Sequence, residues 1–176
     1  MAQPKYRIAT IGSHSALQIF KGAHDEGFET IAICKKGYES PYKMFNVADE
    51  IISIDSYKNF PKIQDQLIKK NAIIIPHGSF VTYMGYGEVE KLKVSYYGNK
   101  RILKWESDRH LERRWLVKAG LKVPLLFKKP EDIDRLVIVK FMGSEGGRGY
   151  FLAKDKNEFY KKIKPYNLRK YVLQEY

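Results

Sequence analysis

The chain has 176 residues, of which 44% are hydrophobic and 30% charged, so it has enough apolar material for one or two packed domains and is not wholly disordered. No apolar run approaches the roughly 18 residues that cross a bilayer, and no apolar core of a secretory signal follows the N-terminus. One cysteine, Cys34, cannot build a disulfide framework or a zinc site. A cytoplasmic protein without a membrane partner is expected.

Positive charge is concentrated in the second half of the chain. Residues 1–97 hold 12 basic and 10 acidic side chains, whereas residues 98–176 hold 20 basic and 10 acidic ones. A basic half favours an anionic partner, either nucleic acid or a phosphate-rich small molecule. A solvated lysine-rich surface would give the same count.

Short apolar strands alternate with helices in the first half. Ser15, with Gln18 three residues later, is a capping-box pattern that predicts the start of the first helix, and a further helix is predicted over residues 60–70. Four buried strands are predicted, at residues 6–11, 30–34, 51–54 and 72–75. This alternation predicts βαβ units around a parallel sheet.

The pattern changes near residue 98, where we place a domain boundary between residues 97 and 98. A helix over residues 108–119 is predicted next, with Leu111, Trp115 and Leu116 on its inward face. Strands are then predicted at 136–141, 150–153 and 171–176, and a helix at 156–163. Since the last strand runs to the final residue with no polar tail, we expect the chain to be the front part of a longer protein.

Two loops of the first half carry candidate ligand-binding residues. Gly12-Ser13-His14-Ser15 follows the first strand, and Pro76-His77-Gly78-Ser79-Phe80 follows the fourth. Ligands of open α/β sheets bind at the carboxyl ends of the strands, and helix N-termini attract anions. Ser13, His14, Ser15, His77 and Ser79 are therefore candidates, and His14 and Ser79 are expected to face one pocket. Otherwise the serines only cap helices and the histidines are surface residues.

A third candidate is the glycine-rich loop predicted over residues 143–149. It lacks the Lys-Ser/Thr ending of a P-loop, and a strand rather than a helix follows it, which argues against a Rossmann fingerprint. A strand, glycine loop and strand instead fit a hairpin lid whose backbone N–H groups lie on phosphates. Lys140, on the preceding apolar strand, would need an anionic partner if buried. The alternative is an exposed hairpin with Lys140 on its wet face.

The order of these parts resembles the ATP-grasp enzymes: an α/β lobe, a Trp-Glu-Ser-Asp-Arg helix, a strand lysine with a glycine hairpin, and an acidic hinge strand. More narrowly, four segments resemble the archaeal formate-dependent FAICAR synthetases, the PurP family. They are Gly12-Ser13-His14-Ser15-Ala16-Leu17, Pro76-His77-Gly78-Ser79-Phe80, Gly98-Asn99-Lys100-Arg101-Ile102-Leu103-Lys104-Trp105-Glu106-Ser107 and Gly146-Gly147-Arg148-Gly149-Tyr150. The resemblance implies an α/β fold with a parallel-sheet, Rossmann-like pre-ATP-grasp lobe (1–97) and the first α+β half of an ATP-grasp domain (98–176).

The resemblance also implies an activity. The family joins formate to the amine of AICAR with ATP, through formyl phosphate, and gives FAICAR, ADP and phosphate in purine (IMP) biosynthesis. Phosphorylation gives formate a good leaving group, so the protein mainly positions reactants and neutralises charge. AICAR, formate and ATP are the implied partners, with Mg²⁺ or Mn²⁺ as the metal and no nucleic acid.

Site residues carry over by position. Ser13, His14, Ser15, His77 and Ser79 fall at the AICAR site, where His14 and Ser79 match the family's own positions. Lys140 matches the lysine on the α/β-phosphates, and the remaining ATP-site residues form the lid and the adenine hinge: Gly143, Gly146, Gly147, Arg148, Gly149, Gln174, Glu175 and Tyr176. The metal ligands and the residues that act on the reacting atoms are implied to lie beyond residue 176.

Three other interpretations stay open. The chain could belong to another ATP-grasp ligase with a different acid and amine. It could be an inactive nucleotide-binding piece, or a basic protein that binds a nucleotide or nucleic acid without catalysis. Self-association into a homo-oligomer is compatible with all of them.

Overall fold

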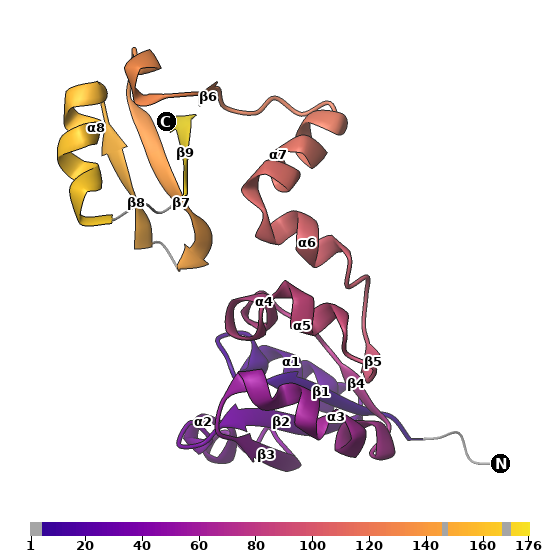
Figure 1. Cartoon of the computed structure of the whole chain (residues 1–176). Helices are drawn as coiled ribbons and strands as arrows, with labels where there is room; N and C mark the ends of the chain where they lie inside the picture. The colour runs from indigo at the N-terminus through magenta and orange to yellow at the C-terminus, as the bar shows by residue number, and fades with distance from the viewer. Residues whose placement is uncertain (1–4, 146–147, 167–169) are drawn as a thin grey trace. The chain divides into compact units, whose positions relative to one another are not determined.

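The computed structural model describes residues 5–145, 148–166 and 170–176. The chain divides into two compact units, residues 1–103 (unit 1) and residues 104–176 (unit 2) (Figure 1). The division falls just after the domain boundary expected at 97/98. Among the described residues, no helix has both the length and the apolar character needed to cross a membrane.

Unit 1 is built on a five-stranded parallel sheet with the order β3-β2-β1-β4-β5. Its strands are β1 (Arg7–Ile11), β2 (Glu29–Lys35), β3 (Glu50–Ile54), β4 (Ala72–Ile74) and β5 (Ser95–Tyr96). The chain moves outward from β1 through β2 to β3 and then returns to the other side of β1. Such a reversal is a topological switch point, and ligands of open α/β sheets bind there, outside the carboxyl ends of the strands.

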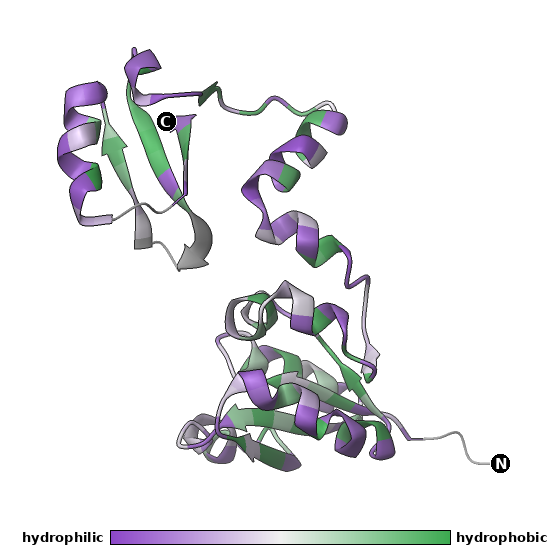
Figure 2. Cartoon of the chain, in the orientation of Figure 1, coloured by the Kyte–Doolittle hydropathy of each residue, from purple (hydrophilic) through white to green (hydrophobic). Residues whose placement is uncertain are grey.

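Helices cover both faces of this sheet. They are α1 (Ala16–Asp25), α2 (Ser40–Met44), α3 (Phe60–Lys69), α4 (Ser79–Met84) and α5 (Tyr86–Glu90), with a 3₁₀ turn η1 (Tyr57–Asn59). Figure 2 shows hydrophobic residues along the strands and hydrophilic ones on the helices around them. One core contains Phe60 and Phe80, and the other contains Phe20, Tyr42 and Cys34. The four predicted strands and the 60–70 helix are confirmed within a residue or two at each end.

The predicted capping box at Ser15 is wrong in detail. Ser15 does precede α1, but its backbone is already helical (φ −93°, ψ −4°) and its hydroxyl makes no capping hydrogen bond. An N-cap side chain reaches the first turn from an extended backbone, which Ser15 does not have. The Gln18 amide instead lies within 3.0 Å of the His14 carbonyl oxygen.

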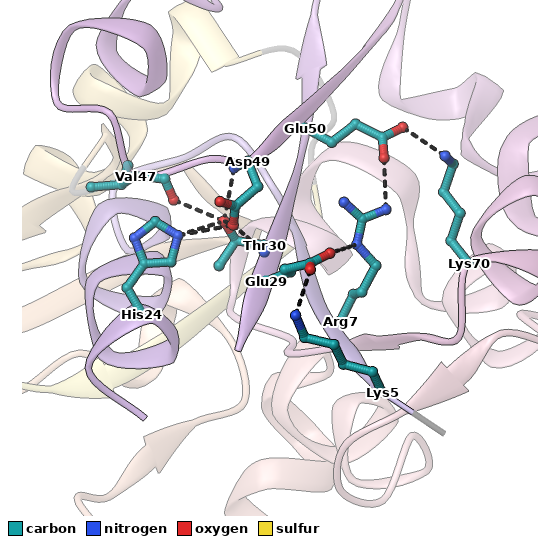
Figure 3. A network of polar contacts seen from close by, with 9 residues as sticks. All are labelled: Lys5, Arg7, His24, Glu29, Thr30, Val47, Asp49, Glu50 and Lys70. Carbon is teal, nitrogen blue, oxygen red and sulfur yellow. Dashed lines mark hydrogen bonds and ion pairs between the residues drawn. The ribbon is translucent and has the colours of Figure 1, made fainter. Parts of the chain in front are cut away.

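The amino edge of the same sheet is closed by a polar network (Figure 3). Arg7 forms ion pairs with Glu29 (3.1 Å) and Glu50 (2.8 Å), and Lys70 pairs with Glu50 (3.1 Å). Beside them, Asp49 accepts hydrogen bonds from the Thr30 backbone N–H (2.7 Å) and the Thr30 hydroxyl (2.9 Å). These ion pairs join the first residues of β1, β2 and β3 to one another and to Lys70, just before β4. The network therefore stabilises the amino ends of the strands.

Unit 2 contains an antiparallel sheet with the order β6-β9-β7-β8. Its strands are β6 (Leu126–Phe127), β7 (Val137–Glu145), β8 (Arg148–Ala153) and β9 (Tyr171–Glu175). Helices α6 (Ile102–Ser107), which crosses the division between the units, and α7 (Arg109–Lys118) precede the sheet, and α8 (Lys156–Ile163) follows β8, with 3₁₀ turns η2 (Pro130–Asp132) and η3 (Lys164–Tyr166). Val137, Val139 and Leu173 pack one sheet face against Phe159 of α8.

Two expectations for unit 2 need correction. The strands on either side of the predicted glycine loop 143–149 are longer than expected, because β7 continues to Glu145 and β8 begins at Arg148, where these two residues pair. Trp115 was expected to face inward, yet it is 42% exposed, and no residue of α7 is fully buried. Helical periodicity identifies an apolar stripe but not whether anything packs on it.

Candidate functional site

The loops after β1 and β4 meet at the switch point, as the strand order predicts. Ser13 Oγ lies 2.5 Å from Ser79 Oγ. His77 donates from Nε2 to the Ile11 carbonyl oxygen (3.1 Å) and accepts the Ser79 N–H at Nδ1 (3.3 Å). These contacts require a neutral ring, and burial lowers the pKa of His77 accordingly. His77 therefore fixes the spacing of the two loops, and both its nitrogens already have partners inside the protein.

A cleft of about 760 Å³ opens beside this contact, at the carboxyl ends of β1, β2 and β3. His14 is exposed along its wall. The lining residues are Gly12, Ser13, His14, Lys35, Tyr38, Pro41, Tyr42, Asp55, Ser56, Tyr57, Thr82 and Tyr83. Hydroxyl groups and aromatic rings dominate this set, which suits a sugar and a flat heterocycle.

Two tyrosines hold the backbone of the first loop. Tyr57 donates its hydroxyl to the Gly12 carbonyl oxygen (2.7 Å), and Tyr42 donates to that of Ser13 (3.4 Å). Burial raises the pKa of Tyr42 to about 12, so this hydroxyl keeps its proton. Tyr83 stacks on Tyr57 with ring centres 4.9 Å apart and lines the cleft.

Lys35 and Asp55 are cleft residues that the sequence reasoning missed. Lys35 ends β2 and Asp55 follows β3, so the rule that selected His14 and Ser79 would have selected them too. Asp55 forms an ion pair (2.7 Å) with Lys36, which does not line the cleft. Neither residue lies in a glycine-containing loop motif, and only such loops of the first half were considered as ligand sites.

Unit 2 holds a second, smaller cleft of about 230 Å³ between α7 and the open face of its sheet. Lys140 lies in it and donates to the Gln174 amide oxygen (3.3 Å). Arg109 donates to the Phe141 carbonyl oxygen (3.3 Å), and Arg113 donates to that of Pro124 (2.6 Å). The remaining lining residues are His110, Glu112, Leu116, Val123, Leu126 and Val172. Three full positive charges against one carboxylate give this cleft a net positive charge, which favours an anionic ligand.

The sequence reasoning found Lys140 but missed Arg109 and Arg113. Their spacing was the available signal, because residues four apart on a helix lie on one face. A triphosphate fits the donor set, since guanidinium and ammonium groups bind phosphate oxygens. Among residues 5–145, 148–166 and 170–176, no three His, Cys, Asp or Glu side chains gather as a metal site.

The backbone N–H groups at the predicted adenine hinge are hydrogen-bonded within unit 2. The Glu175 N–H donates to the Leu125 carbonyl oxygen (2.9 Å), and the Tyr176 N–H donates to that of Leu136 (3.2 Å). The Glu175 carboxylate accepts from Arg135 (3.1 Å) and from the Leu125 N–H (3.2 Å). Both N–H groups are thus used inside unit 2, where β9 lies between β6 and β7.

The lid residues are placed only in part. Gly143 lies on β7 and Gly149 on β8, where its φ of +92° is a value that favours glycine. Arg148 pairs with Glu145 through the backbone. Gly146 and Gly147 lie outside the described residues.

Comparison with solved structures defines the class of fold. An ADP complex of PurK, an N5-carboxyaminoimidazole ribonucleotide synthetase, matches 100% of this chain and 48% of its own with a TM-score of 0.78 at 16% identity. The ADP complex of the Staphylococcus aureus N5-carboxyaminoimidazole synthetase matches with a TM-score of 0.77 at 22% identity, over 97% of this chain and 47% of its own. The fold is that of the N-terminal half of ATP-grasp enzymes, as the sequence predicted.

Residues 8–127 match the family described as "Protein of unknown function (DUF1246)", and the chain belongs to this family. It is 51% identical, over 97% of its length, to 5-formaminoimidazole-4-carboxamide-1-(beta)-D-ribofuranosyl 5'-monophosphate synthetase of Pyrococcus abyssi and covers 51% of that protein. For the synthetase of Methanocaldococcus jannaschii the identity is 49%, over 96% and 47%. The IMP biosynthesis protein PurP of Thermococcus kodakaraensis matches with a TM-score of 0.71 at 27% identity, over 96% and 50%.

The resemblance to the PurP family is thus confirmed, and the chain is a homologue of these ATP-grasp ligases. The chain spans about half the length of the curated relatives it matches.

Proposed function

We propose that this chain forms the substrate-binding and part of the ATP-binding region of an ATP-dependent ligase. The ligase joins formate to AICAR and gives FAICAR, ADP and phosphate. The observation that carries this proposal is the cationic cleft of Lys140, Arg109 and Arg113, in a chain about half identical to FAICAR synthetases. Unit 1 supplies the second requirement, a hydroxyl-rich and aromatic cleft at a switch point that suits an aminoimidazole ribonucleotide. An enzyme of purine biosynthesis would act in the cytoplasm.

The proposed chemistry has two steps. A formate oxygen attacks the γ-phosphorus of ATP, the bond to the β-phosphate oxygen breaks, and ADP leaves. The AICAR amine then attacks the carbon of formyl phosphate, the carbon–oxygen bond breaks, and phosphate leaves as the nitrogen loses a proton. Lys140, Arg109 and Arg113 would hold the triphosphate and neutralise its charge, while His14, Ser13 and Ser79 would hold AICAR.

The remaining predicted residues take supporting roles in this proposal. Ser15 lies beside His14 at the AICAR loop, and His77 positions Ser79 rather than contacting the ligand. Glycines 143, 146, 147 and 149 would let the hairpin approach the phosphates closely. Bound Mg²⁺ or Mn²⁺ would add positive charge at the phosphate oxygens, with ligands outside the described residues of this chain.

The test is a coupled measurement of product masses. The protein is incubated with ATP, formate and AICAR, and FAICAR and ADP are quantified together. We expect both products in equal amounts, loss of FAICAR without formate, and strong loss in the Lys140→Met variant. If ADP forms with a different acid or amine and its formation does not depend on AICAR, the proposal is wrong. The protein would then serve another ATP-grasp ligase activity.

A further inference from the structure

Lys35 is a cation that lines the first cleft. Its ammonium Nζ lies 5.6 Å from the centre of the Tyr38 ring, a cation–π distance. Among residues 5–145, 148–166 and 170–176, no carboxylate forms an ion pair with Lys35, whereas the adjacent Lys36 is paired with Asp55 at 2.7 Å. Lys35 thus places an ammonium group beside the hydroxyl groups of the cleft, and the lining carboxylate of Asp55 is engaged by Lys36.

The carboxylates near this edge are committed elsewhere. Asp55 lines the cleft but is held by Lys36. Glu39 accepts hydrogen bonds from the Gly37 N–H (2.9 Å) and the Ser53 hydroxyl (2.6 Å). Both acidic groups have lowered pKa values, Asp55 because of the Lys36 hydrogen bond and Glu39 because of the Ser53 hydrogen bond. Neither forms an ion pair with Lys35, so its ammonium group can meet a negative charge on a ligand without giving up a partner in the protein.

The position of Lys35 indicates which part of a ligand it meets. In doubly wound folds the residue at the carboxyl end of the second strand faces the sugar end of a nucleotide, where an acidic side chain selects hydroxyls and a basic one a phosphate. Lys35 ends β2, next to the Gly12–His14 loop that follows β1. A compact ammonium on a flexible stem is suited to a phosphate group.

We propose that Lys35 binds the phosphate of the ribonucleotide substrate and makes the cleft select a nucleotide over the corresponding nucleoside. The identity of the base rests on the proposed function, but the selection for phosphate rests on the cleft alone. Tyr38 holds the ammonium at the wall of the cleft, and Lys35 gives up no internal ion pair when phosphate binds. Its exposure lets a phosphate reach it without a rearrangement of the core.

The experiment measures affinities of the whole protein by calorimetry for three probes: AICAR, the nucleoside that lacks its phosphate, and ribose 5-phosphate. Three proteins are compared: the wild type, Lys35→Gln, and the matched control Lys69→Gln. Lys69 is an exposed lysine at the end of α3, which leads into the amino end of β4, so it lies at the opposite edge of the sheet. Lys35→Arg keeps the charge and serves as the second variant.

We expect Lys35→Gln to weaken AICAR and ribose 5-phosphate by about tenfold or more, since a charge-assisted hydrogen bond is lost, and to change the nucleoside less than about twofold. Lys69→Gln should change none of the three, and Lys35→Arg should retain the preference for phosphate. An equal loss for nucleoside and nucleotide, or a wild type that binds both equally, would overturn the inference.

The same samples separate this inference from the proposed function. If AICAR is formylated but Lys35→Gln does not discriminate between the probes, the inference fails and the function stands. If Lys35 selects ribose 5-phosphate but AICAR is never formylated, the function fails and the inference stands.

Discussion

Replacing Gly12 by alanine tests how tightly the first loop is built. A Cβ atom on Gly12 would lie 3.0 Å from both Cε2 and Oη of Tyr42 and 3.2 Å from its Cζ. Favourable contacts between carbon atoms lie at about 3.5–4.0 Å, so the ring would have to retreat by roughly half an ångström. Tyr42 is only 6% exposed and meets the fully buried Phe20 edge-on at 5.8 Å, which leaves it little room.

We therefore expect Gly12→Ala to lower the free energy of unfolding of unit 1 by about 2 kcal/mol, within the usual range for overpacking. Cys34 provides the assay, because it is fully buried in the same core cluster as Tyr42. Burial raises the pKa of its thiol to about 12, so Cys34 should be labelled only when unit 1 unfolds. The extent of labelling against urea concentration gives the stability of this unit.

Two further variants sharpen the test. Gly22→Ala is the matched control, because a Cβ there has no atom within 4 Å, and alanine should stabilise α1 by about 0.5–1 kcal/mol. Combining Gly12→Ala with Tyr42→Leu should cost less than the two single changes together, with a coupling above about 1 kcal/mol. A neutral Gly12→Ala, or strictly additive costs, would refute the close-approach argument.

Three more predictions concern the two clefts and the ends of the elements. Lys140→Met should weaken ATP binding by about tenfold or more and spare AICAR, whereas His14→Ala should do the reverse; equal losses in calorimetric titrations would contradict separate sites. Burial acts to raise the pKa of Glu50, but hydrogen bonds from Lys70 and Arg7 outweigh it and hold that pKa below its ordinary value. Its stabilisation is thus fully present above the unfolded pKa of about 4.3 and is lost as the pH falls through the folded pKa. Glu50→Gln should flatten this acid loss in Cys34 labelling, and an unchanged profile would count against the network. Asp108 accepts the backbone N–H groups that begin α7, so Asp108→Ala should cost about 1 kcal/mol in melts followed by tryptophan fluorescence, while Asp108→Asn should cost much less.

Periodicity and strand order predicted most of the fold, and the failures have physical reasons. β5 and β6 have only two residues each, so no period can reveal them, and they are held by neighbouring strands. Trp115 lies on a helical stripe that nothing in the described chain covers completely. Burial is a property of the assembled neighbours, which a local pattern does not contain.

The candidate site was likewise predictable only where a local rule applies. His14 and Ser79 were predicted to face one pocket because parallel strands end at one edge. The two loops do meet, through the hydroxyls of Ser13 and Ser79, but His14 lines the cleft and Ser79 does not. The rule that ligands bind at the carboxyl ends of strands would also have identified Lys35 at the end of β2, although no sequence motif marks this residue. The triad of Lys140, Arg109 and Arg113 joins a helix to a strand, so only the tertiary fold brings these three side chains together.

The position of β9 has a consequence for how the protein is made. Residues 171–175 pair with β7 on one side and with β6 on the other, so the last of the four described strands of unit 2 to be synthesised lies between two strands made before it. Unit 1 contains all five of its strands by residue 96 and can begin to fold while the rest is being translated. The sheet of unit 2 cannot close until β9 has left the ribosome, because its pairing with β6 joins residues far apart in the sequence. Until then the edges of β6 and β7 are unpaired, and this interval is when the nascent chain is most exposed to misassembly.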